Sequence, residues 1–266
     1  MSKSERAHGM SDRFWFVQKA FKLFGCRIVR LDEDWQDMEQ DFKRISAECM
    51  NFTVTSIERM YALYKAVEYV VESEIPGDLV ECGVWRGGSC MLMARTLISL
   101  GDTSRKIYMY DTYSGMAEPS DDDVATDGAR ARVIWEAGVE KDESSEWCFS
   151  SPAEVKKNLA STGYPAENMV FVEGKVEDTI PGTAPERISI LRLDTDWYES
   201  TLHELVHLYP LLENRGVLIT DDYGYWEGCR KAVNEYFAEN GVSMFLNRVD
   251  LNARLGIKCE CQDQGS

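Results

Sequence analysis

Basic residues are scarce in this chain, and their shortage excludes one class of partner. Of the 266 residues, 29 are Lys or Arg and 46 are Asp or Glu, which gives a formal net charge of −17 at pH 7. Proteins that bind nucleic acids contact the phosphates through clustered Lys and Arg side chains. We therefore expect no nucleic-acid partner.

Long apolar runs are also missing. No stretch approaches the roughly 18 apolar residues that a membrane-spanning helix needs, so we expect no membrane span. The apolar segment 14–30 contains four basic residues and therefore differs from a secretion signal. Its aromatic and aliphatic residues recur near helical spacing, which favours packing on its own domain or on a second subunit of a homo-oligomer. A helix lying on a membrane surface is the alternative.

Zinc-type cysteine motifs are absent as well. The chain has eight cysteines but no C-x-x-C, and Cys259 and Cys261 form only a C-x-C near the end. Two thiols at this spacing are too few for a zinc site. Scattered cysteines without a secretion signal are typical of free thiols in a reducing compartment, so we expect a cytoplasmic protein.

Apolar runs typical of buried strands alternate with helical patterns from about residue 55 onward. A helix is expected to begin at Thr55, where Thr55–Glu58 matches a capping box. The alternation predicts an α/β fold with a doubly wound, mostly parallel, Rossmann-like sheet, and two final strands predict an antiparallel hairpin at one edge. The expected strands are 78–83, 106–111, 169–172, 188–194, 217–221, 242–249 and 254–259, and helices are expected at 88–100, 199–212 and 228–239 and from Ser151 onward.

A long acidic connection, 112–150, follows the second expected strand. Connections of this length in a compact domain are usually lids or disordered segments. Trp135 and Trp147 favour a lid because they give the segment apolar surface to bury. We therefore expect an N-terminal helical extension, 1–52, that serves as a lid or an oligomer contact, followed by one domain, 53–266, with the acidic lid inserted.

A glycine-rich turn follows the first expected strand, in the run VECGVWRGGS that begins at Val80. It lacks the G-x-G-x-x-G of dinucleotide sites and the G-K-[ST] of P-loops. It resembles the E-x-G-x-x-x-G turn of class I S-adenosylmethionine methyltransferases, whose backbone faces the cofactor. A tight connecting turn is the alternative. The resemblance implies these cofactor-binding residues: Glu81, Gly83, Val84, Gly87, Gly88, Ser89, Asp111, Thr112 and Ser114.

Asp111 has a specific expected role among them. It ends the second strand, where an acidic residue of these methyltransferases commonly holds the ribose hydroxyls. A carboxylate suits a ribose because it accepts both vicinal hydroxyl protons. Taken alone, Asp111 is equally consistent with a helix cap or a solvated strand end.

Two carboxylate pairs end the fourth and fifth expected strands: Asp194 with Asp196, and Asp221 with Asp222. Neighbouring parallel strands end at one crevice, so the four carboxylates are expected to repel one another unless a cation lies among them. Oxygen ligands favour a hard divalent cation such as Mg²⁺. Asp196 shares a side with Asp194 if the strand stays regular. Consecutive aspartates share a site only if their strand has ended, and a solvated turn is the alternative.

A competing motif occurs in the helix after the fourth strand. His203–His207 matches the H-E-x-x-H of zinc metalloproteases. The longer pattern fails, because Pro210 and Glu213 occupy the places of its glycine and its third histidine. The remaining histidine, His8, is near the N-terminus. We therefore favour two histidines on a helix flank over a protease.

Several stretches resemble the macrocin, mycinamicin and novobiocin-pathway sugar O-methyltransferases. They are IERMYALYKAVEYVV, IPGDLVECGVWRGGSCMLMA, IYMYDTYSGM, LRLDTDWYESTLHELVHLYPLL, GVLITDDYG and GCRKAVNEYF. The resemblance extends from about Thr53 to Lys258, and the motifs are specific in combination. It implies metal-dependent methylation of hydroxyl groups, typically on deoxysugars of natural products.

The same resemblance assigns roles to residues. It implies that the metal ligands are Asp194, Asp221 and Asp222, that the general base is Asp196, and that Tyr223 and Trp197 border the site. One departure is Thr195, where several relatives are expected to have glycine.

We therefore expect transfer of a methyl group from S-adenosylmethionine to a hydroxyl of a sugar or natural-product glycoside. One alternative is a catechol-type phenolic O-methyltransferase, although such enzymes have a lysine near the metal ligands where this chain has Asp196-Trp197-Tyr198. The other is a non-catalytic module that binds S-adenosylmethionine. The presence of all four aspartates is evidence against that module.

Overall fold

The computed structural model describes residues 35–138 and 147–259. They fall into two compact units, Met1–Lys43 and Arg44–Ser266. In the first unit the described residues form a turn and the beginning of helix α2 (Gln40–Cys49). The helix expected at 14–30 lies outside the described residues, and the division at residue 52 remains a prediction.

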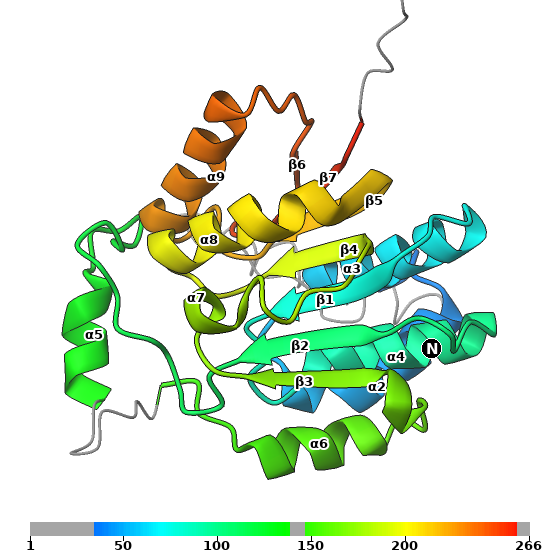
Figure 1. Cartoon of the computed structure of the whole chain (residues 1–266). Helices are drawn as coiled ribbons and strands as arrows, with labels where there is room; N and C mark the ends of the chain where they lie inside the picture. Colours follow the sequence, from blue (N-terminus) through cyan, green and yellow to red (C-terminus); the bar gives the residue numbers. More distant parts are fainter. Residues whose placement is uncertain (1–34, 139–146, 260–266) are drawn as a thin grey trace, which may run out of the picture. The chain divides into compact units, whose positions relative to one another are not determined.

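The second unit is built on a seven-stranded sheet with the order β3-β2-β1-β4-β5-β7-β6 (Figure 1). Its first five strands are parallel, whereas β7 runs antiparallel to both of its neighbours. This arrangement confirms the doubly wound sheet with a hairpin at its edge. The strands are β1 (Asp78–Cys82), β2 (Ile107–Asp111), β3 (Met169–Glu173), β4 (Ile188–Leu193), β5 (Leu212–Thr220), β6 (Asn247–Arg248) and β7 (Arg254–Ile257).

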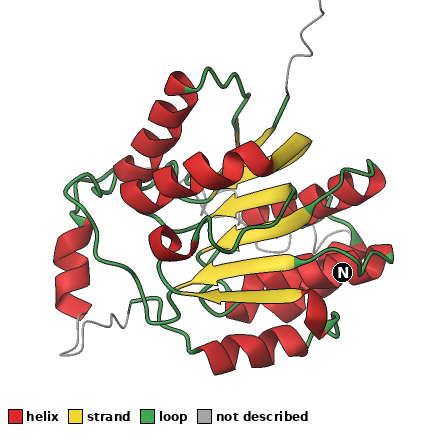
Figure 2. Cartoon of the chain, viewed as in Figure 1, coloured by secondary structure: helices red, strands yellow, loops and turns green. Residues whose placement is uncertain are grey.

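Helices cover both faces of the sheet (Figure 2). Helices α3 and α4 pack together on one face, and α8 and α9 pack together on the other. The helices of this unit are α3 (Ile57–Glu72), α4 (Gly88–Leu100), α5 (Ala131–Gly138), α6 (Pro152–Ala160), α7 (Val176–Thr179), α8 (Tyr198–Leu208) and α9 (Glu227–Glu239), with short 3₁₀ turns η1 (Met50–Phe52), η2 (Ala166–Asn168) and η3 (Tyr209–Leu211). Every helix within the described ranges is too short or too polar to cross a bilayer.

Several element boundaries differ from the expectation. Strand β5 begins at Leu212 rather than at 217, and α8 ends at Leu208 rather than at 212. Helix α3 is capped by Ser56 rather than Thr55, because the Ser56 hydroxyl accepts the backbone N–H of Arg59 at 3.2 Å. Strand β6 has two residues rather than the expected eight, since residues 242–246 contain apolar side chains but form no ladder. Apolar content alone therefore overstated the length of an edge strand.

The central strand β4 is buried along its whole length, although its sequence ISILRL contains an arginine. Arg192 is 2% exposed. A charge removed from water in this way needs anionic partners. Those partners lie at the carboxyl ends of the strands, which is the edge of the sheet where α/β proteins bind ligands.

Candidate active site

A cavity of about 330 Å³ opens at the carboxyl ends of β1, β2, β4 and β5. Its wall brings together the glycine turn after β1, Asp111 at the end of β2 and all four aspartates that follow β4 and β5. Of the residues expected to bind the cofactor, the following line this cavity: Glu81, Gly83, Val84, Ser89 and Asp111.

The other residues expected to bind the cofactor lie elsewhere. Thr112 and Ser114 line an adjoining hollow beside Gly174 and Lys175. Gly87 packs against α6, where a Cβ would come within 2.6 Å of the Leu159 side chain. A Cβ on Gly88 would likewise lie 2.6 Å from the carbonyl oxygen of Phe52. Chain packing therefore accounts for these two glycines, and a role for them in cofactor binding stays a prediction.

Gly83 is required by close approach of two strand ends. A Cβ at this position would lie 2.0 Å from the Asp194 carbonyl oxygen, and the residue has φ +84°. Only glycine tolerates both conditions. The glycine turn is thus pressed directly against the first of the predicted metal ligands.

Asp111 fastens the glycine turn from the other side. Its Oδ2 accepts the backbone N–H groups of Val84 at 2.7 Å and Trp85 at 2.9 Å, and its Oδ1 accepts that of Tyr113 at 2.7 Å. Burial raises the pKa of Asp111, and these N–H groups act in the opposite direction. Each carboxylate oxygen has two lone pairs, so Oδ1 retains capacity for a ribose hydroxyl.

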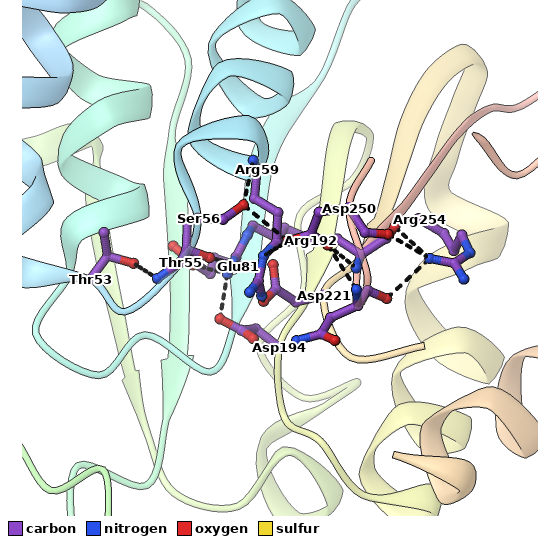
Figure 3. A network of polar contacts seen from close by, with 12 residues as sticks. Thr53, Thr55, Ser56, Arg59, Glu81, Arg192, Asp194, Asp221, Asp250 and Arg254 are labelled. Carbon is purple, nitrogen blue, oxygen red and sulfur yellow. Dashed lines mark hydrogen bonds and ion pairs between the residues drawn. The ribbon is translucent and has the colours of Figure 1, made fainter. Parts of the chain in front are cut away.

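The aspartates share the site with two arginines that the sequence analysis missed (Figure 3). Arg192 forms ion pairs with Glu81 at 2.5 Å and with Asp194 and Asp221 at 2.6 Å each. Arg59, from α3, contacts the second oxygen of Asp221. The expectation that only a bound cation could relieve the carboxylate repulsion is therefore corrected, because guanidinium groups supply part of the positive charge. The signal in the sequence was a lone arginine within an apolar strand.

Three of the aspartates can still share an ion. Asp194, Asp221 and Asp222 each offer a carboxylate oxygen within 4.8 Å of the others. The Oδ2 atom of Asp222 is buried without a hydrogen-bond partner. Because β5 ends at Thr220, both consecutive aspartates lie beyond the strand, which is the condition for sharing one site. Burial, together with the neighbouring carboxylates, raises the pKa values of Asp194 and Asp222.

Asp196 lines the cavity although β4 does not continue to it as a regular strand. Strand β4 ends at Leu193, and Asp196 has the left-handed value φ 69°. Such conformations are uncommon outside glycine and cluster at functional sites. Burial raises the pKa of Asp196 to about 7, while a hydrogen bond with Asp222 lowers it.

Aromatic side chains form another wall near the site. The rings of Trp147, Trp197 and Trp226 lie with centroids 5.1 to 6.3 Å apart. Trp147 and Trp226 line the cavity, as does Tyr225, and Trp197 lines a smaller adjoining one. Tyr223 was expected to border the site, but its hydroxyl donates to Asn234 at 2.9 Å and its ring contacts two arginines. Tyr225 is therefore the tyrosine on the cavity wall.

The H-E-x-x-H residues do not assemble a zinc site. His203 and His207 are adjacent, with ring centroids 4.4 Å apart. His203 Nε2 bonds to the Ile180 carbonyl at 2.9 Å, and Glu204 is buried beneath Thr195, whose hydroxyl donates to it at 2.9 Å. Within the described part of the chain, the cluster of residues able to hold a metal is the aspartate trio.

Comparison with known proteins gives concordant matches. The sequence pattern of the family described as Macrocin-O-methyltransferase (TylF) matches residues 29–255. The 8-demethyl-8-(2,3-dimethoxy-alpha-L-rhamnosyl)-tetracenomycin-C 4'-O-methyltransferase of Streptomyces olivaceus is 36% identical over 199 residues, which are 74% of this chain and 72% of that protein. The mycinamicin III 3''-O-methyltransferase of Micromonospora griseorubida is 31% identical over 198 residues, which are 74% and 75% of the two chains.

Among solved structures, the O-methyltransferase NovP has a TM-score of 0.69 and 30% sequence identity, and the match covers 79% of this chain and 83% of that one. A putative caffeoyl-CoA O-methyltransferase from Staphylococcus aureus has a TM-score of 0.54 at 13% identity, a likeness that concerns the fold alone.

Proposed function

The chain belongs to the macrocin-O-methyltransferase (TylF) family and is an S-adenosylmethionine-dependent O-methyltransferase, and from this premise we propose its acceptor, its metal and its base. It transfers a methyl group to a hydroxyl of a sugar within a glycoside. Asp194, Asp221 and Asp222 would hold a divalent cation, and Asp196 would be the general base. The observation that carries the proposal is the aspartate trio, with its unpartnered Asp222 oxygen, on the same cavity as the glycine turn.

The donor atoms fit a hard cation. All three are carboxylate oxygens, and sites composed of oxygen favour Mg²⁺ or a similar ion over zinc. When bound, such an ion would make an acceptor hydroxyl more acidic and would fix its orientation.

Asp196 is suited to remove the hydroxyl proton. It lies on the cavity wall and forms a hydrogen bond with Asp222, and a general base must be within hydrogen-bond reach of the proton that it removes. As the Asp196 carboxylate takes the proton, the hydroxyl oxygen bonds to the methyl carbon and the carbon–sulfur bond breaks, its electrons passing to sulfur. The products are a methyl ether and S-adenosylhomocysteine.

The charge of the cavity favours an acceptor without phosphate. Among its described lining residues the cationic side chain is Arg59, and this guanidinium is already paired with Asp221 and Asp250. The diphosphate of a nucleoside diphosphate sugar would meet carboxylates instead of free cations, at an energetic cost. The aromatic wall suits a neutral sugar attached to an apolar aglycone. The name of the Streptomyces olivaceus relative likewise describes a rhamnosyl compound as the acceptor, so glycosyl transfer is expected to precede methylation.

The proposal is tested with the full chain, S-adenosylmethionine and three acceptors: a deoxysugar glycoside, the matching nucleotide sugar, and caffeate. We expect methylation of the glycoside, loss of activity after chelation and recovery with Mg²⁺. Preferential methylation of caffeate would favour a phenolic methyltransferase instead. Cofactor binding without turnover of any acceptor would favour a non-catalytic module.

A further inference from the structure

Arg192 occupies the most unusual position in the sheet for a charged residue. It lies in β4, the middle strand of the seven-stranded sheet. All six residues of β4 are buried, and the Arg192 side chain is 2% exposed. An ion pair buried this deeply gives little stability beyond that of a well-packed apolar side chain. The other five side chains of ISILRL carry no charge. The role of Arg192 is therefore expected to lie in the carboxylates that it contacts rather than in stability.

Its guanidinium joins the ends of three strands (Figure 3). Nη1 donates to Glu81 Oε1 on β1 at 2.5 Å and to Asp194 Oδ2 beyond β4 at 2.6 Å. Nη2 donates to Asp221 Oδ1 beyond β5 at 2.6 Å. Glu81 is itself fixed, because the Cys90 thiol donates to its other oxygen at 2.6 Å. The planar fork of an arginine can make these contacts together, whereas a lysine ammonium is a single point of charge.

The contacts leave lone pairs free on the ligand carboxylates. Asp221 accepts Arg192 at one oxygen and Arg59 at the other, and each of these oxygens has a second lone pair. Arg192 takes one oxygen of Asp194, so the Oδ1 atom of that carboxylate remains for an ion. Asp222, the third member of the trio, retains a buried Oδ2 atom without a hydrogen-bond partner. The arginine thus determines where two of the three carboxylates lie without occupying the space between them.

We propose that Arg192 is a positioning residue of the metal site, which fixes Asp194 and Asp221 in ligand geometry before the ion arrives. The inference rests on the metal dependence proposed above. Residues that orient metal ligands from behind typically change metal affinity by about 10- to 100-fold when they are replaced. The orienting group here is the Arg192 guanidinium, which is itself positively charged. It should raise metal affinity by fixing the two carboxylates and lower it by repelling the divalent cation. The gain in metal affinity from orientation is expected to exceed the loss from charge repulsion.

The test is Mn²⁺ binding, followed by electron paramagnetic resonance without acceptor or turnover. Arg192→Lys keeps the charge but loses the fork, and we expect Mn²⁺ affinity to fall about 10- to 100-fold while the protein stays folded by circular dichroism. The matched control is Arg105→Lys, since Arg105 is also largely buried and pairs with Asp102 far from the trio. It should bind Mn²⁺ as the parent does. Unchanged or tighter binding by Arg192→Lys would overturn the inference.

A measurement on the unmodified protein covers the case in which Arg192→Lys does not fold. The guanidinium resonances of Arg192 should show slow rotation in the metal-free protein and stay unchanged when Mg²⁺ is added. A guanidinium that becomes fixed only after the ion is added would contradict preorganisation. The variant Asp222→Asn separates the two levels of the proposal. If the parent binds Mn²⁺ no better than Asp222→Asn, the metal site itself is rejected. If the parent binds Mn²⁺ better than Asp222→Asn but Arg192→Lys binds as tightly as the parent, only the positioning role of Arg192 is rejected.

Discussion

At the scale of single residues, the site balances carboxylates against guanidinium groups. The four aspartates could be predicted from the sequence because they follow apolar strand patterns, and strand ends meet at one edge of the sheet. Arg192 and Arg59 could not, since strand periodicity says nothing about which buried charges pair. The left-handed backbone of Asp196 was equally hidden, because it depends on how the chain leaves β4.

Replacing Asp196 tests the proposed base. Asp196→Asn keeps the shape of the side chain but cannot accept a proton at neutral pH, so turnover is expected to fall about 100- to 10,000-fold. The affinity for S-adenosylmethionine, measured by calorimetry, should stay the same because Asp196 is proposed to act on the acceptor. The exposed Asp127→Asn serves as the control and should leave both quantities unchanged. Turnover of Asp196→Asn at the level of that control would remove Asp196 from the mechanism.

At the scale of elements, β1 to β4 matched the expected ranges to within a residue or so, whereas β5 begins five residues before its expected start. Their continuous apolar runs have one interpretation in an alternating α/β sequence. Prediction was weaker where tertiary contacts decide, as in β6 and in the segment 112–150. The described parts of that segment place Ile134 and Trp147 on the cavity wall. Whether the segment opens and closes as a lid remains a prediction.

The glycine turn is expected to depend on Asp111. Asp111→Ala removes the acceptor of three backbone N–H groups, so the turn should loosen and the affinity for S-adenosylmethionine should fall at least about 10-fold, given about 1.5–3 kcal/mol for a hydrogen bond to a charged group. Glu173→Ala is the matched control, because Glu173 pairs in register with Asp111 at the end of β3 but is exposed. Equal affinities of the two variants in calorimetry would show that the turn does not need this carboxylate.

Helix α8 has a cap supplied from outside its own sequence. Asp123, which is 1% exposed, accepts the backbone N–H of Tyr198 at 2.8 Å. Asp123→Ala should lower the free energy of unfolding by about 0.5–2 kcal/mol, the usual cost of a lost cap. Asp122→Ala should cost less than Asp123→Ala, because the ion pair of Asp122 with Lys231 lies at the surface. Chemical denaturation of both variants checks this, and equal losses would mean that Asp123 does not cap the helix.

At the scale of the whole molecule, the net charge of −17 favours cationic ligands. S-adenosylmethionine carries a sulfonium charge that S-adenosylhomocysteine lacks. Salt screens charge–charge attraction. With rising NaCl, the affinity for S-adenosylmethionine should therefore fall by a few-fold more than the affinity for S-adenosylhomocysteine. Calorimetric titrations at several ionic strengths measure the difference. Parallel salt dependence of the two ligands would mean that the field of the protein does not act on the methyl donor. The expected homo-oligomer also remains a prediction.

The most direct test of the proposed metal site is anomalous diffraction from crystals grown with Mn²⁺ and S-adenosylhomocysteine. We predict one strong manganese peak coordinated by carboxylate oxygens of Asp194, Asp221 and Asp222, on the same cavity as the cofactor product. A cavity that holds S-adenosylhomocysteine but shows no manganese among these three aspartates would contradict the proposed metal site.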